Sequence, residues 1–232
     1  MTKNFYLARA FTFIELLVVM VVLGVLFTIA YPVFIGTQER AKVTKDMNNL
    51  RQIGLATQTY MNDNDGVLPG STTVRWMSQL ELNQKYLSAW AVLQSPFDSR
   101  SPSENGTTAP VSPVSYGINA NVYPGGIAIS ADKITKPTVF ILFAPAQAAG
   151  VAVTFSGLAT EAAPGVRVLG IGGARATSTP GGDAIGGTQN NRARINALFA
   201  DLHAESMDWT TFTKNTADPP TDPDGYLRWN PF

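Results

Sequence analysis

The sequence contains no cysteine and a single histidine among its 232 residues. Without cysteine, neither a disulfide framework nor a thiolate metal site can form. Charge is also scarce, because 17 basic and 17 acidic residues amount to 15% of the chain and cancel to a net charge of zero. Nucleic-acid binding draws on an excess of positive charge, so this balance gives no indication of a nucleic-acid partner. A domain of this composition must depend on its apolar core, or on a bound ion.

Residues 16–35 carry no charge at all. These twenty residues, at ~1.5 Å per residue, form a helix of ~30 Å, which is long enough to cross the hydrocarbon core of a bilayer. Glu15 lies at the N-terminal edge of this segment, where a carboxylate costs on the order of 2.5–3.5 kcal/mol on insertion scales. The nearest upstream cation, Arg9, is six residues away. We therefore expect Glu15 to need a partner that its own turn does not supply.

A cut between Ala10 and Phe11 would supply that partner. It would create an ammonium group on Phe11, and Glu15 of one copy could pair with the new terminus of a neighbouring copy. The isolated carboxylate would then drive assembly.

The same segment resembles the class III leader and N-terminal helix of type IV pilins and type II secretion pseudopilins. A short basic leader ends in the small residue Ala10, Phe11 is the first mature residue, and Glu15 is the fifth. Gly24 and Pro32 fall where these families commonly carry residues that loosen or bend the helix. One feature departs from the pattern, because Gly usually stands where this chain has Ala10, although the families tolerate Ala. The resemblance implies cleavage by a prepilin peptidase, N-methylation of Phe11 and a role for Glu15 in assembly.

Two other interpretations account for less of the pattern. A secretory signal peptide has an apolar run of ~7–15 residues followed by a small-x-small cleavage site. Here the run is longer, and no Ala-x-Ala follows before Tyr31 and Pro32. A plain uncleaved anchor explains the length of the run and leaves Glu15 and the leader unexplained.

Beyond Pro32 the sequence predicts an amphipathic continuation of the same helix to about Asn62. Apolar and small residues recur at spacings of three and four from Val43 to Tyr60, which is typical of one face of a helix packed on a domain. The opposite face is expected to be polar, with Arg40, Lys42, Lys45, Asp46, Asn49 and Arg51. The four predicted parts of the chain are the leader 1–10, the membrane and filament-core helix 11–35, its amphipathic continuation 36–62 and a globular head 63–232.

The head is predicted to be α+β, with an antiparallel sheet packed on the long bent helix, as in pilins. One or two short helices are expected in residues 76–93, and a β pattern begins at Val114. The run 138–143 favours a central strand, and residues 151–155 and 166–169 are weaker strand candidates.

Parts of the head resemble large pseudopilin-like proteins of planctomycete and verrucomicrobial type bacteria. The segment 195–205 is similar to a Phe-Ala-Asp-Gly-His hairpin of these proteins, in which Asp-Gly makes the turn. In this chain Leu202 replaces the Gly, and Leu is poorly suited to positive φ, which leaves the turn type open. Ser95 stands where these relatives often have Cys.

His203 is the one histidine, and Asp201 and Glu205 would share its face if the segment were extended. Three roles remain open for it at this point: structural hydrogen bonding, metal binding and catalysis. In the tail, Trp209, Tyr226 and Trp229 are expected to anchor the chain to the sheet.

The tail also holds three carboxylates in a proline-rich loop, Asp218, Asp222 and Asp224. Carboxylate oxygens are the ligands that Ca²⁺ prefers, and some major pseudopilins bind calcium in a C-terminal loop. The loop therefore predicts a Ca²⁺ site.

Together these features predict a filament subunit that is not an enzyme. Its expected partners are a prepilin peptidase, copies of itself and other pilin-like subunits, an inner-membrane assembly platform and the membrane, with no nucleic acid. Basic residues in the leader favour a cytoplasmic N-terminus and a periplasmic head, followed by incorporation into a periplasmic or extracellular filament. The head favours a type II secretion pseudopilus over a type IV pilus for adhesion, motility or DNA uptake. The alternative of another class is a membrane-anchored periplasmic binding or hydrolytic domain.

Overall fold

A computed structural model describes residues 11–70, 75–81, 85–100, 114–148, 153–155, 168–169, 186–213 and 224–232. The chain divides into two compact units, residues 1–41 and residues 42–232. The second unit is called the head below.

Helix α1 runs from Phe13 to Asp63. Its residues up to Ala41 belong to the first unit, and the rest of the helix belongs to the head. It continues through Pro32 without interruption, and Gly24 has open space around it. The expected bend at these two positions stays a prediction. The helix ends one residue beyond the predicted Asn62, where Asn64, Asp65 and Gly66 turn the chain.

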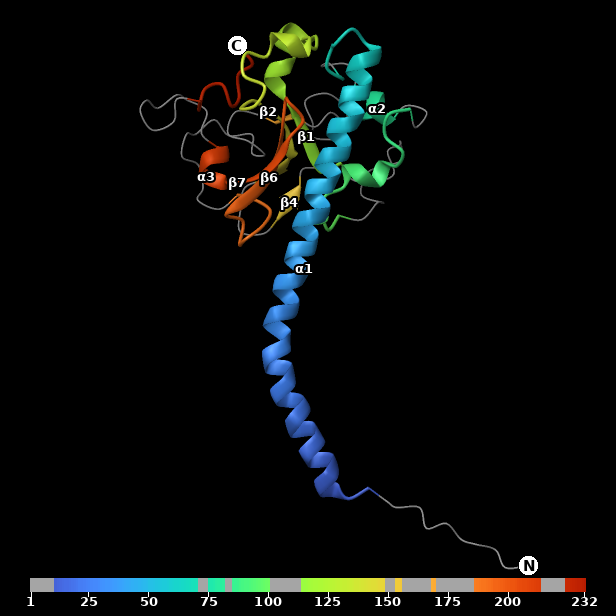
Figure 1. Cartoon of the computed structure of the whole chain (residues 1–232), viewed down its shortest axis with the longest axis vertical. Helices are drawn as coiled ribbons and strands as arrows, with labels where there is room; N and C mark the ends of the chain where they lie inside the picture. The colour runs from blue at the N-terminus through green and yellow to red at the C-terminus, as the bar shows by residue number, and fades with distance from the viewer. Residues whose placement is uncertain are drawn as a thin grey trace, which may run out of the picture. The chain divides into compact units, whose positions relative to one another are not determined.

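The head is built on a five-stranded sheet in the order β5-β1-β2-β6-β7. Figure 1 labels β1, β2, β6 and β7 of this sheet. Four of its strands are antiparallel neighbours, β1 (Tyr116–Asn119), β2 (Ile141–Pro145), β6 (Arg194–Phe199) and β7 (Ala204–Asp208). The short β5 (Val168–Leu169) pairs with β1 in the parallel sense, which the sequence did not predict. The predicted α+β architecture, a long helix with an antiparallel sheet, is confirmed.

Shorter elements precede, connect or follow these strands. They are α2 (Trp76–Glu81), the 3-10 helices η2 (Trp90–Leu93), η4 (Ala120–Val122), η5 (Pro124–Gly126) and η6 (Ala131–Lys133), the two-stranded sheet of β3 (Gln147–Ala148) with β4 (Thr154–Phe155), and α3 (Trp209–Phe212). One or two short helices were expected in residues 76–93, and α2 and η2 lie there.

The central strand begins three residues later than predicted. Val139 and Phe140 both donate backbone hydrogen bonds to the carbonyl oxygen of Lys136, at 3.0 Å each, and so form a turn. The strand proper starts at Ile141. Every residue of β2 is buried, because apolar side chains cover both faces of the sheet.

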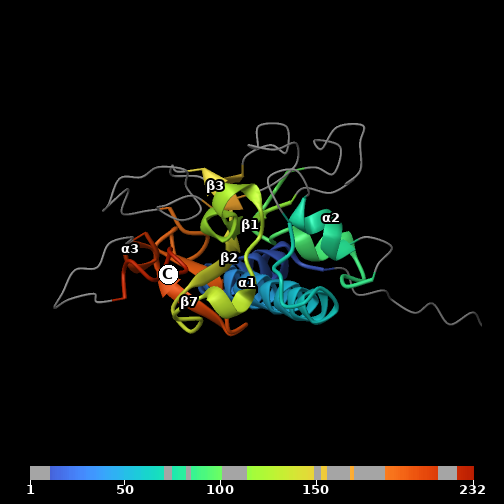
Figure 2. The ribbon, with the colours of Figure 1, turned by 90° about the horizontal axis from the view of Figure 1, so that it is seen from above.

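The head half of α1 lies along one face of the sheet (Figure 2). A core between helix and sheet contains Leu50, Ile53, Tyr116, Phe143 and Leu198, with Trp76 of α2. The opposite face carries a second core of Ile141, Ile195, Ala197, Phe199, Trp209, Phe212 and Trp229. Helix and sheet approach closely at Gly54, where a Cβ atom would lie 3.2 Å from both Cδ atoms of Leu198.

The C-terminal tail is anchored by two of the three aromatic residues expected to do so. Trp209 and Trp229 are buried, and the indole Nε1 of Trp229 donates to the carbonyl oxygen of Phe212 at 3.0 Å. The prediction for Tyr226 was wrong in part, because its side chain remains 48% exposed.

The predicted polar face of α1 also needs correction. Asp46 and Asn49 were expected on the solvent side, yet both are buried, with 0% and 5% exposure. They turn inward because the sheet and the segment before β1 offer them hydrogen-bond partners. A hydrophobicity pattern along one helix contains no information about such partners.

Candidate functional site at the start of the helix

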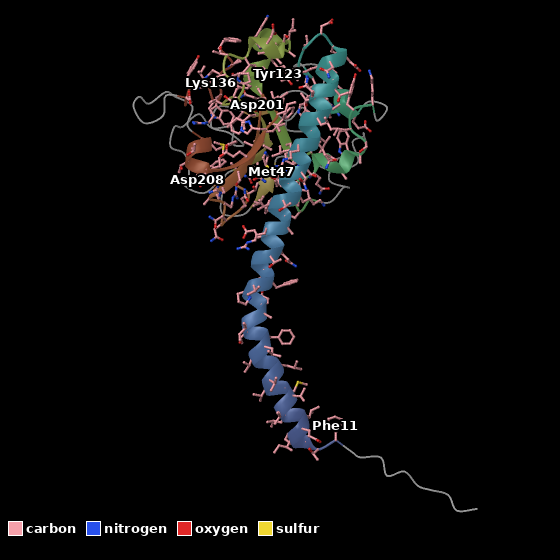
Figure 3. The ribbon with its side chains drawn as sticks, viewed as in Figure 1. Phe11, Met47, Tyr123, Lys136, Asp201 and Asp208 are labelled. Carbon is pink, nitrogen blue, oxygen red and sulfur yellow. The ribbon has the colours of Figure 1, made fainter. Side chains whose placement is uncertain are left out.

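The first turn of α1 is closed by a reciprocal pair of side chains, Thr12 and Glu15. The backbone N–H and the Oγ1 hydroxyl of Thr12 each donate to Glu15 Oε2 at 2.8 Å, and the backbone N–H of Glu15 points to Thr12 Oγ1 at 3.3 Å. This is a capping box, in which two otherwise unpaired backbone donors of a helix start are satisfied by side chains. Phe11 and Thr12 consequently lie outside the helix, which begins at Phe13 (Figure 3).

The capping box shows how a single copy accommodates Glu15. The sequence predicts a partner in a neighbouring copy, whereas here neutral donors of its own chain hold the carboxylate. Thr12 is not among the predicted site residues, although a Thr followed three residues later by Glu before an apolar run indicates a capping box.

The apolar part of α1 exposes its side chains on every side. Between residues 16 and 35 the exposed fraction of the large apolar side chains ranges from 42% at Leu23 to 69% at Phe27. Soluble monomers rarely expose a continuous apolar surface of this extent, so it marks a surface for membrane or protein contact. Within the described residues, α1 contains the one stretch that is long and apolar enough to cross a membrane.

Residues 7–31 match the family described as the prokaryotic N-terminal methylation motif. The N-terminus of this chain is of the pilin type. The matched segment includes the bond between Ala10 and Phe11, the carboxylate of Glu15 and much of the apolar helix, and it does not extend into the head. Comparisons with curated proteins and with solved structures each gave no match. Segments of this type belong to structural subunits that a prepilin peptidase processes and that assemble with other pilin-like subunits.

The remaining predicted residues at the N-terminus are placed only in part. Phe11 is 83% exposed. Ala10, the other side of the expected cut, lies outside the described residues.

The predicted calcium ligands are also described in part. Asp224 is bound through Oδ1 to the ammonium group of Lys136, and Asp218 and Asp222 lie outside the described residues. Within the described part of the chain, no group of three or more His, Asp or Glu side chains is arranged to hold a metal ion. The calcium site therefore stays a prediction.

His203 takes part in the turn between β6 and β7. Its Nδ1 contacts Oδ1 of Asp201, its ring stacks on Phe199 with 4.3 Å between centroids, and its Nε2 is 4.0 Å from Glu205 Oε2. The same Asp201 oxygen accepts the backbone N–H of His203 at 3.2 Å. These contacts fix the turn, and they support structural hydrogen bonding among the three roles considered for His203.

The hydrogen bonds of this turn define its type, which the presence of Leu202 had left open. Phe199 donates its backbone N–H to the carbonyl oxygen of His203 at 2.9 Å, and Leu202 donates to that of Phe199 at 3.0 Å. The three residues between Phe199 and His203 form a turn whose last residue has the left-handed conformation. This is the usual geometry of a three-residue hairpin loop. Leu202 occupies that position with φ of 69°.

Proposed function

We propose that this chain is a prepilin-type subunit of a type II secretion pseudopilus. A prepilin peptidase would cut before Phe11 and methylate the new amine. The apolar part of α1 would hold the subunit in the inner membrane with the head in the periplasm, and would later pack against the helices of neighbouring subunits in the filament.

The observation that carries this proposal is the exposed apolar helix with a single carboxylate at its start. A membrane anchor needs the apolar surface and has no use for Glu15. A filament subunit needs both, because the carboxylate can pair with the Phe11 ammonium group of the next copy. The capping box supports a two-step course, in which Thr12 holds Glu15 in the stored subunit and the neighbouring ammonium group replaces Thr12 on assembly.

The choice of a pseudopilus rests on the resemblance of the head to large pseudopilin-like proteins. A type IV pilus subunit shares the same N-terminal segment, so it is the runner-up within this class. Imaging of the native filament distinguishes the two, because a pseudopilus is a short fibre in the cell envelope and a pilus is a long surface fibre.

The first test is the N-terminal mass and sequence of the protein recovered from its own membranes. We expect a chain that begins with N-methylated Phe11. A mature chain that still begins at Met1 or Thr2 would refute processing and favour a membrane-anchored periplasmic domain.

The second test separates the charge of Glu15 from its role in the capping box. Glu15→Gln keeps a side-chain oxygen that can accept from Thr12 and removes the charge, whereas Glu15→Ala removes both. We expect both variants to insert into the membrane and to be incorporated into filaments at least tenfold less than wild type. The control is Glu39→Ala, which removes a carboxylate from the same helix outside the apolar segment. This variant should assemble normally. Normal incorporation of Glu15→Gln would contradict the pairing of charges.

A further inference from the structure

The hydrogen bonds of Thr12 define where α1 begins. The backbone N–H of Leu16 donates to the carbonyl oxygen of Thr12 at 3.3 Å, which is the first bond of the helical ladder. A residue whose carbonyl accepts this bond while its own backbone stays outside the helix is the N-cap. The reciprocal bonds between Thr12 and Glu15 complete the cap, and the first helical residue is Phe13.

The leader sequence contains no residue that would stop the helix at this point. Residues 1–10 include neither Gly nor Pro, the two residues that disfavour a helix most strongly. Four strong helix formers come directly before Phe11, namely Leu7, Ala8, Arg9 and Ala10. Intrinsic propensity therefore favours a helix that starts further upstream. The capping box of Thr12 and Glu15 opposes this lengthening.

The start of the helix matters because a lengthened helix would include the bond between Ala10 and Phe11. In an α-helix each carbonyl oxygen accepts the N–H four residues later, so the oxygen of Ala10 would be bonded to the N–H of Ile14. A peptidase stabilises the tetrahedral intermediate through hydrogen bonds to that same oxygen. A bond within the helix would thus be protected from hydrolysis, whereas a bond ahead of the N-cap is accessible to the peptidase.

We propose that Thr12 is a positioning residue for processing, because its capping box with Glu15 ends the helix before the scissile bond. In the hydrolysis, water adds its hydroxyl to the carbonyl carbon of Ala10 and its proton to the nitrogen of Phe11, while the C–N bond breaks. Thr12 acts on these atoms only through the start of the helix. The inference rests on the proposed cut before Phe11, and the family match covers that bond independently of the hydrogen bonds.

The size of the effect follows from the strength of helix caps. Loss of a Thr N-cap shifts the equilibrium toward the lengthened helix by about 2- to 30-fold. Val has the shape of Thr and about the same helix propensity, and it lacks the hydroxyl. Thr12→Val therefore removes the cap with little other change, whereas Thr12→Ser keeps it.

The test follows conversion of the full-length precursor to the mature chain in cells that contain a prepilin peptidase, by pulse labelling and the mass of the N-terminus. We expect Thr12→Val to be processed about 2- to 30-fold more slowly than wild type, and Thr12→Ser to restore most of the rate. Glu15→Gln should slow processing less than Glu15→Ala, because Gln also serves in a capping box. Equal rates for Thr12→Val and Thr12→Ser would overturn the proposal.

A second background separates the cap from direct contact between the Thr12 hydroxyl and the peptidase. Ala10→Gly disfavours a helix across the scissile bond by about four- to fivefold. The lengthened helix is then less populated, so Thr12→Val should slow processing by a smaller factor in Ala10→Gly than in wild type. The same factor in both backgrounds would show that the peptidase contacts the hydroxyl, and the role of the cap would be refuted.

Amide hydrogen exchange of the precursor in detergent micelles reports the start of the helix directly. The N–H groups of Phe13 and Ile14 lie in the first turn, where an α-helix offers them no carbonyl partner. In a lengthened helix they would bond to the carbonyl oxygens of Arg9 and Ala10. Exchange at Phe13 and Ile14 should be slower in Thr12→Val than in wild type and Thr12→Ser. Slower processing without slower exchange would count against the proposal.

Failure of the proposed function would give a different result. A wild-type precursor that is not cut before Phe11 in the presence of a prepilin peptidase would refute processing, and the role of Thr12 with it. If wild type is cut and Thr12→Val is cut equally fast, processing stands and only the role of Thr12 is refuted.

Discussion

The contact between Gly54 of α1 and Leu198 of β6 allows a quantitative test of how the helix is fastened to the sheet. Leu198 is fully buried, and both of its Cδ atoms lie 3.2 Å from the place that a Cβ atom on Gly54 would take. The helix can therefore approach the sheet this closely because residue 54 has no side chain. Truncation of Leu198 and addition of a methyl group at Gly54 should compensate for each other.

The single substitutions set the scale. Leu198→Ala removes a buried side chain and leaves a cavity, which destabilises by about 2–5 kcal/mol. Gly54→Ala gains about 0.8–1.0 kcal/mol of helix propensity. In wild type the new methyl group presses against Leu198, so we expect the propensity gain to be largely cancelled.

The double substitution should behave differently from the sum of the two. Once Leu198 is truncated, the methyl group at residue 54 enters free space and adds about 0.8 kcal/mol of apolar burial to the helix propensity gain. Gly54→Ala should then recover about 1–2 kcal/mol of the stability lost in Leu198→Ala, combining both terms. The expected coupling energy is about 1 kcal/mol or more, within the range found for residues in contact.

The assay is denaturant unfolding of the four full-length proteins in detergent, followed by tryptophan fluorescence. Leu55→Ala, on the exposed side of the same helix, controls for effects of substitution on α1 alone, and it should leave stability nearly unchanged. Additivity of the two substitutions within about 0.3–0.5 kcal/mol would refute the close approach of helix and sheet at this point.

Two further outcomes test the turn and the tail. Leu202→Gly should stabilise the head by about 0.5–1 kcal/mol in the same assay. The reason is that the left-handed conformation costs a non-glycine residue roughly 1–2 kcal/mol. A loss of stability would show that packing of the Leu202 side chain outweighs this cost. If the tail binds Ca²⁺, as proposed for Asp218, Asp222 and Asp224, a chelator should lower the melting temperature of the wild-type head and leave that of Asp222→Asn unchanged. A melting temperature of wild type that does not respond to the chelator would remove the calcium site.

The pattern of residues along the chain was enough to predict those features that depend on local periodicity. The uncharged run after Glu15 defines the apolar helix, and the spacing of Leu50 and Ile53 defines the face that packs on the sheet. The end of α1 was predicted because its turn residues lie next to one another in sequence, whereas the hairpin of β6 and β7 was predicted from the resemblance of residues 195–205 to a known hairpin. Such features need only neighbours within about one turn of helix or one hairpin.

Predictions failed where contacts between distant segments decide the outcome. Asp46 was assigned to the solvent face because it is charged, and its burial depends on Ser95, Tyr116 and Asn196, which lie 49, 70 and 150 positions away along the chain. The parallel pairing of β5 with β1 likewise joins segments that no local pattern connects.

The sequence by itself therefore determined which part of this protein carries its long exposed apolar surface, because that surface is a continuous stretch of one helix. Only the tertiary structure decided how the head is fastened to that helix. The reason is physical: a buried carboxylate is tolerated when donors from several strands and loops converge on it, and that convergence exists only after the chain has folded.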